Sequence, residues 1–173
     1  MTHIDKPKEG EYGPHDEIYI GLVPDDGNLL AHLEENLRSA MEFFRSIPDE
    51  KLSSRYAEGK WTVKEVLGHI IDTERIYGYR ILRFARNDST ELPGFDQDGF
   101  VNQSHADRRE IGDMLDELAA VRASSVMLLK GLDADAMERG GIASGRRLTV
   151  RAAAYILAGH EQHHITIIKE RYL

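Results

Sequence analysis

The end of the sequence carries three histidines within five residues, at positions 160, 163 and 164. Successive residues of a helix are about 100° apart, so His160 and His164 lie on one face, one turn apart. The apolar residues of this segment share that face, which predicts that both imidazoles point into the packed interior, with His163 at the rim. Two buried imidazoles are costly unless their nitrogens have partners, and a divalent metal ion accepts two at this spacing. The pattern predicts a metal site; the alternative is a pair of ordinary core histidines.

The elements that must position these residues are four segments with the apolar spacing of amphipathic helices. The second begins at a predicted capping box of Thr62 and Glu65, and Trp61 can pack against the first turn as a hydrophobic staple. We expect the four helices at residues 28–47, 62–87, 107–130 and 149–172.

Between these helices we predict connectors and no strand. Residues 89–106 are expected to form a long loop, whose two phenylalanines favour packing over disorder. The glycine-rich residues 132–147 form the other connector. Residues 1–25 hold three of the five prolines, which favours an extended N-terminal arm, followed by a single domain at 26–173.

Four amphipathic helices joined by loops are typical of an all-α four-helix bundle, whose sites are built from side chains on facing helices. His69, at the flank of the buried stripe of the second helix, could meet His160 and His164 across such a core. Three neutral imidazoles with an open fourth position form the ligand set of a catalytic zinc-type site. Imidazole also suits nickel, iron and copper, so the ligand set does not identify the metal.

Two carboxylates are candidates for a role beside the histidines. Glu74 lies near the middle of a buried stripe, where we expect an arginine across the core to pair with it; the alternative is a role in the site. Glu161 follows His160 directly and could act as a base for an activated water or could orient a histidine.

Composition limits the classes of partner and chemistry. With 30 acidic and 22 basic residues the net charge is -8, which repels phosphate backbones and anionic membranes, so we expect no nucleic-acid or membrane partner. There is no cysteine, so thiol chemistry would need an external thiol. No apolar run approaches the ~20 residues of a membrane span and the N-terminus has no signal pattern, which predicts a cytoplasmic protein.

Three stretches resemble the DinB and YfiT-like family of metal-binding four-helix bundles. They are WTVKEVLGHIIDTE at residues 61–74, PGFD at 93–96 and GHEQHH at 159–164. The resemblance covers most of the chain, from the first helix to the end. It implies that one histidine of the second helix and an H-x-x-x-H pair of the last helix bind a divalent ion, which places the ligands at His69, His160 and His164.

The resemblance leaves three functions open. Some relatives transfer or isomerise groups with a low-molecular-weight thiol such as bacillithiol or mycothiol, and this thiol S-transferase type is our first hypothesis. The second is a metal-dependent hydrolase with Glu161 or Glu74 as base. The third is a non-catalytic bundle that binds metal for stability or sensing. The expected ion is zinc or nickel, the expected partner is a small-molecule substrate, and the family resemblance implies a homodimer.

Overall fold

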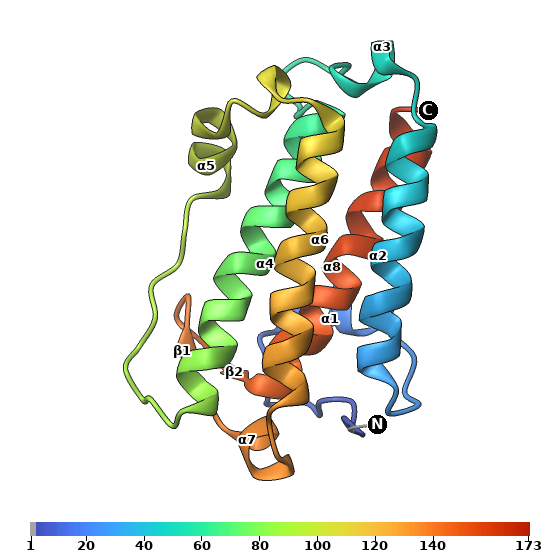
Figure 1. The fold of residues 1–173 in the computed structure, drawn as a ribbon. Helices are drawn as coiled ribbons and strands as arrows, with labels where there is room; N and C mark the ends of the chain where they lie inside the picture. The colour runs from blue at the N-terminus through green and yellow to red at the C-terminus, as the bar shows by residue number, and fades with distance from the viewer. Residues whose placement is uncertain (1–2) are drawn as a thin grey trace.

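The computed structural model describes residues 3–173 and shows a bundle of four long helices with short elements at its ends and along its sides (Figure 1). The long helices are α2 (Leu29–Ser46), α4 (Val63–Ala85), α6 (Ile111–Lys130) and α8 (Val150–Arg171). The short elements are η1 (Pro14–Asp16), α1 (Glu17–Ile20), α3 (Asp49–Leu52), α5 (Gln97–Ser104), η2 (Ala106–Arg108), α7 (Ala134–Glu138), β1 (Gly140–Ala143) and β2 (Arg146–Thr149). The predicted all-α four-helix bundle is confirmed, with helix bounds close to those expected.

The helices do not simply alternate in direction. In Figure 1, α2 and α8 run one way and α4 and α6 run the other, and α4 packs against both α8 and α6. Since α4 and α6 are parallel, the chain must return along the whole length of the bundle between them. The predicted long connection after α4 makes this return.

The start of α4 follows the predicted capping box. The Thr62 hydroxyl accepts a hydrogen bond from the Glu65 backbone N–H at 3.1 Å, and the Glu65 carboxylate accepts one from the Thr62 N–H at 2.8 Å. These bonds satisfy backbone donors that the first turn leaves free. They fix where α4 begins, and therefore which of its side chains face the core.

Two features of the connectors differ from the sequence prediction. Residues 97–104 and 106–108 are helical rather than loop, and residues 140–149 form an antiparallel hairpin where no strand was predicted. The sequence does not predict helix α5, because this helix buries only Val101 and therefore has no apolar stripe. The sequence does not predict the hairpin, because its strands have only four residues each. The chain turns at Ser144 and Gly145, both with positive φ (54° and 74°). Such turns usually carry asparagine or aspartate rather than serine at the first position.

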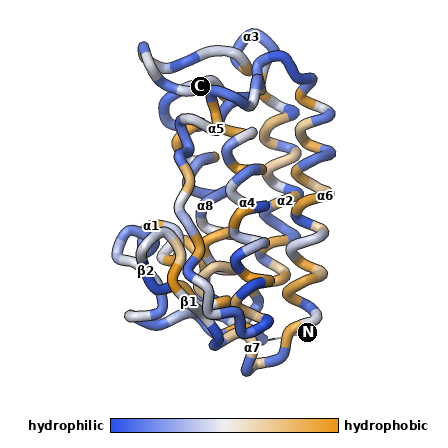
Figure 2. Tube along the Cα trace, turned by 90° about the vertical axis from the view of Figure 1, so that its left-hand side faces the viewer, coloured by the Kyte–Doolittle hydropathy of each residue, from blue (hydrophilic) through white to orange (hydrophobic). Residues whose placement is uncertain are grey.

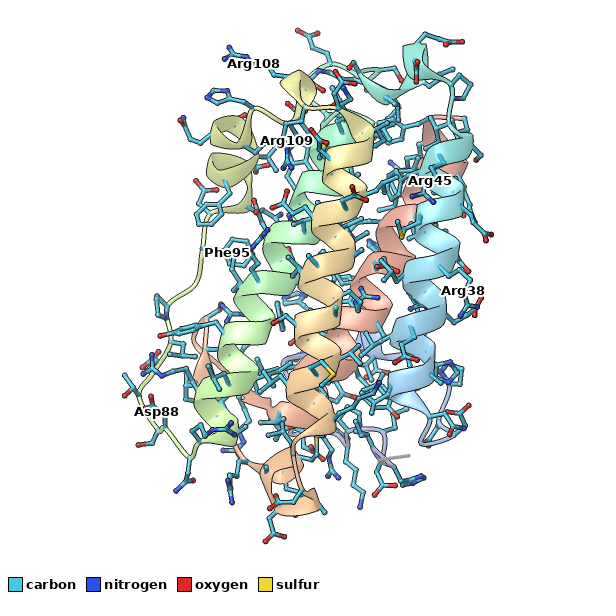
Figure 3. The ribbon with its side chains drawn as sticks, viewed as in Figure 1. Arg38, Arg45, Asp88, Phe95, Arg108 and Arg109 are labelled. Atoms are coloured by element: carbon cyan, nitrogen blue, oxygen red, sulfur yellow. The ribbon has the colours of Figure 1, made fainter. Side chains whose placement is uncertain are left out.

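The hairpin holds the long connection in place. Leu92 donates its backbone N–H to the Ile142 carbonyl at 2.9 Å, and its own carbonyl accepts from the Ser144 N–H at 3.0 Å. The residues that follow, 93–96, therefore run beside α4, and Phe95 points from this segment toward the helix (Figure 3).

The N-terminal segment lies against the bundle and includes η1 and α1. Tyr155 of α8 donates its hydroxyl hydrogen to the Ile4 carbonyl at 3.0 Å. Helix α1 approaches α8 so closely that a Cβ at Gly159 would lie 1.9 Å from the Tyr19 carbonyl oxygen, so only glycine fits there. Figure 2 shows α1 near the hairpin, and its contact with Gly159 places it beside the middle of α8. Met1 and Thr2 of the predicted arm lie outside the described residues, and the division into an arm and one domain stays a prediction.

The bundle interior has two apolar clusters with polar side chains between them. One cluster includes Leu33 and Tyr77, and the other includes Ala40 and Ile70. The buried polar residues between the clusters are Thr73 and Glu74 of α4, Arg122 and Ser125 of α6, and His160 and Glu161 of α8. Buried polar groups in the middle of a bundle are costly, so this layer is the candidate functional part of the molecule.

Candidate metal centre

The three predicted ligands come together in the core. His69 extends from α4, and His160 and His164 extend from α8, one turn apart. The Nε2 atom of His160 lies 3.0 Å from that of His69 and 3.1 Å from that of His164. One potential ligand atom from each residue lies within 4.8 Å of the other two. The structure thus confirms that the histidines meet, while metal ligation by them stays a prediction.

The arrangement fits a metal ion better than it fits histidines bonded to one another. A neutral imidazole has one N–H and one acceptor nitrogen, so three Nε2 atoms that converge on one point cannot all satisfy each other. A tetrahedral ion with metal–nitrogen distances of about 2.0–2.1 Å separates its ligand nitrogens by about 3.3 Å, which is close to the contacts seen here. A shared cation would satisfy all three acceptors at once.

The imidazoles are held in the neutral form that binds metal. Burial lowers the pKa of His69 to about 4, an effect that the negative charge of Asp98 partly opposes. Burial, with the neighbouring His69 and His163, lowers the pKa of His164 to about 3. Burial and the three nearby histidines likewise place the pKa of His160 well below its usual value. Neutral ligands at physiological pH need no proton release before an ion binds.

These shifts predict that the metal-free protein loses stability in mild acid. Because folding lowers the pKa of His69 from 6.5 to about 4, the unfolded chain binds more protons between these values. The contribution of this residue to the free energy of unfolding is fully present above pH 6.5. It is lost as the pH falls toward 4, and the loss amounts to about 3 kcal/mol. Urea unfolding of chelator-treated protein across this range measures it. The His69→Leu variant should lose less stability over the same interval; an equal loss in both proteins would contradict the linkage.

Aromatic rings surround the cluster and restrict the orientations of the imidazoles. The Trp61 ring centroid lies 4.9 Å from that of His69, and the Tyr19 centroid lies 5.3 Å from that of His160. His163 packs edge-on against Tyr19 and His164 and lies outside the group of three, at the rim as predicted. The contribution of Tyr19 could not be foreseen, since it depends on how the N-terminal segment docks.

The expected arginine partner of Glu74 is Arg122 of α6, which also pairs with Glu161. Arg122 Nε and Nη2 donate to the two oxygens of Glu74 at 2.8 and 2.9 Å, and Nη2 also donates to Glu161 at 2.7 Å. Burial opposes the charge of Arg122, but the two carboxylates outweigh it and hold its pKa above the usual range. Burial raises the pKa of Glu161 more than Arg122 lowers it, and its Oε1 has no partner among the described residues.

Neither glutamate lines the cavities that reach the histidines, so the geometry gives no support to a base role, which stays a prediction. Asp98 of α5 is a further carboxylate near the histidines, a position that the sequence did not predict. Its Oδ1 accepts a hydrogen bond from Trp61 Nε1 at 3.1 Å, and it shares a cavity with His164. No residue spacing predicts this position, because Asp98 approaches the histidines only through the packing of α5 against α4.

The cluster borders two cavities. One, of about 320 Å³, is lined by His164, Trp61 and Asp98 among others. The other, of about 270 Å³, is lined by His69 and His160 together with residues of α4, the hairpin and the N-terminal segment. A small molecule could therefore reach the histidines from two directions.

Comparison with known proteins agrees with this geometry. Across 149 residues the chain is 26% identical to OB0413 of Oceanobacillus iheyensis, which is named as a presumed metal-dependent hydrolase; 85% of each chain is covered. The fold of the present chain is similar to that of YfiT from Bacillus subtilis, which is described as a probable metal-dependent hydrolase with an unusual four-helix bundle topology. The TM-score is 0.78 and the identity 19%, over 98% of this chain and 94% of YfiT.

A second solved structure with this fold is a mycothiol-dependent maleylpyruvate isomerase, with a TM-score of 0.64 and 9% identity over 83% of this chain and 59% of the isomerase. A DinB-like protein of Bacillus subtilis matches with a TM-score of 0.58 and 17% identity, over 82% of this chain and 87% of that protein. The sequence model of the DinB superfamily matches residues 32–168, which include all three histidines. The chain therefore belongs to the DinB superfamily.

Proposed function

We propose that the protein is a metal-dependent enzyme in which His69, His160 and His164 hold one divalent ion, zinc or nickel. Its activity is that of a thiol S-transferase, with an external low-molecular-weight thiol as cosubstrate. The observation that carries this proposal is the position of the convergent Nε2 atoms between two cavities, which suits a reaction of two substrates. A bound ion would lower the pKa of a thiol or water and supply a nucleophile near neutral pH.

The side chains around the cluster have distinct tasks in this proposal. Trp61 and Tyr19 pack on the imidazoles and keep their Nε2 atoms converged. Asp98, fixed by its hydrogen bond from Trp61, lies where it can accept the proton of a nucleophile in the cavity next to His164. The larger cavity then receives the thiol, and the smaller one receives the second substrate.

A metal-dependent hydrolase is the second candidate. Two points favour it: the names of OB0413 and YfiT, and the carboxylate of Asp98 in the cavity that His164 also lines. In this reading one cavity holds water and the other holds the substrate. The non-catalytic alternative predicts that metal raises the melting temperature while no substrate analogue binds.

We expect thiols to change the visible absorption spectrum of the cobalt-substituted protein. Cobalt reports ligand exchange at the ion, and a thiol that enters the open position alters both the intensity and the energy of the bands. The experiment titrates bacillithiol, mycothiol and glutathione into wild type and into the Asp98→Asn variant. A spectrum insensitive to every thiol would contradict the transferase proposal. Ester or amide hydrolysis that requires the metal, with no response to thiols, would favour the hydrolase.

The partners follow from the same proposal. The substrate is a small molecule, because the cavities are small and the chain is acidic, and no nucleic-acid partner is expected. None of the helices in residues 3–173 has the length and apolar character needed to cross a membrane. A cytoplasmic location and a homodimer remain proposals, and light scattering tests the dimer.

A further inference from the structure

The smaller cavity carries an excess of positive charge that the proposed chemistry does not use. Arg80 of α4 and Arg146 of β2 line it together with a single carboxylate, Asp16. Asp16 is bound by Arg146, whose Nη2 lies 3.0 Å from Asp16 Oδ1. Two guanidinium groups thus face one carboxylate, in a protein whose net charge is -8.

Arg80 is the guanidinium that forms no direct ion pair among the described residues, although its Cζ lies 5.0 Å from the centroid of the Tyr77 ring. It is 3% exposed, and its Nη2 donates only to neutral acceptors, the Pro93 carbonyl at 3.2 Å and the Ser144 hydroxyl at 2.7 Å. The one carboxylate of the cavity, Asp16, acts on Arg80 through its charge but is bound directly by Arg146, so the two guanidinium groups share a single negative charge. Burying an unpaired charge is costly, and a bound anion would offset that cost.

A second polar group in the cavity lacks a partner. The hydroxyl of Thr73 is buried, with the residue 3% exposed, and it makes no hydrogen bond to any described residue. Thr73 lies one helical turn after His69 on the same face of α4, and Arg80 follows on that face about two turns later. Side chains of a helix lean toward its N-terminus, so the arginine extends back toward the threonine and the histidine.

The cavity therefore offers, along one face of α4, a histidine of the candidate metal centre, a hydroxyl without a partner and a guanidinium that forms no direct ion pair. We propose that it binds the oxyanion of a small substrate, a carboxylate or a phosphate, between Thr73 and Arg80, so that the rest of the substrate lies against His69 and His160. This names the substrate class of the enzyme proposed above and rests on that function. The volume of about 270 Å³ limits the substrate to a small metabolite.

The test measures binding of small anions and their neutral analogues to the full chain by isothermal titration calorimetry. The probes are succinate, its diamide succinamide, and inorganic phosphate, each with metal-free and zinc-loaded protein. A charge-assisted hydrogen bond in a buried site is expected to make succinate or phosphate bind about tenfold or more tightly than succinamide. The tighter of the two anions identifies carboxylate or phosphate as the preferred group.

The variants separate charge from packing. Arg80→Gln should weaken anion binding about tenfold or more, Arg80→Lys, which keeps the charge but not the guanidinium geometry, should weaken it less, and Arg83→Gln, outside the cavity on the same helix, should stay within about threefold of wild type. Thr73→Val should weaken binding without lowering the thermal midpoint, because it removes a hydroxyl that has no partner. A merely structural role for either residue would lower the midpoint and leave the anion preference intact.

The proposal is overturned if wild type binds none of the anions at millimolar concentration, binds succinamide as well as succinate, or is unaffected by Arg80→Gln. Metal content determined on the same samples keeps the two proposals apart. Anion binding in a chain that takes up no metal would leave the oxyanion site and remove the proposed enzyme. Metal uptake without anion binding would leave the metal site and remove the oxyanion site.

Discussion

Replacing His160 by alanine is expected to abolish stoichiometric metal binding. Wild type, purified without a tag and reloaded with zinc or nickel, should carry about one divalent ion per chain, and the variant should carry almost none. His160 is the central member of the cluster, since its Nε2 contacts those of both other histidines. Its loss leaves two nitrogens from different helices, too few for a tight site. Plasma mass spectrometry of the dialysed proteins measures the metal content.

His163 provides the matched control, because it lies on the same helix, three residues after His160, and outside the cluster. His163→Ala should keep the full metal content. If both variants lose metal equally, the ligand set is wrong. If wild type takes up no ion after reloading, the three histidines have only a packing role.

The parts of the structure that could be predicted from the sequence are those set by local spacing. The capping box at Thr62 and the apolar stripes located the long helices, and the interval between His160 and His164 placed both on one inward face. The place of His69 in the site could not be predicted from spacing alone, because its contact with the other two histidines depends on which helices are neighbours. The bundle architecture made that contact plausible, and the family resemblance singled out the residue.

The remaining features of the site depend on tertiary contacts that have no local signal. The partner of Glu74 could be expected to be an arginine, but only packing of α6 against α4 identifies it as Arg122. Tyr19 reaches the histidines through an N-terminal segment that docks where Gly159 permits. Arg80 and Arg146 lie 66 residues apart in the chain and share a cavity because a hairpin, unseen in the sequence, folds back beside α4.

Replacing Arg122 by methionine is expected to destabilise the fold strongly. The side chain is 1% exposed and carries the only positive charge that contacts Glu74 or Glu161 among the described residues. Its removal leaves two buried carboxylates without a counter-charge, and breaking such a group typically costs about 3–5 kcal/mol. Urea denaturation, with the free energy of unfolding compared at equal m-values, measures the loss.

The contacts of Arg122 with Glu74 and Glu161 also predict which further substitutions restore the lost stability. If the cost arises from uncompensated charge rather than from lost packing, then adding Glu74→Gln and Glu161→Gln to Arg122→Met should recover a large part of the stability. Glutamine keeps the shape of each side chain but removes the charge that made burial costly. A triple variant no more stable than the single variant would show that packing of the guanidinium, not its charge, holds α4, α6 and α8 together at this layer. Glu74 and Glu161 lie on α4 and α8, the helices that carry the histidines, so Arg122→Met is also expected to lower the metal content, and the triple variant should recover metal content together with stability.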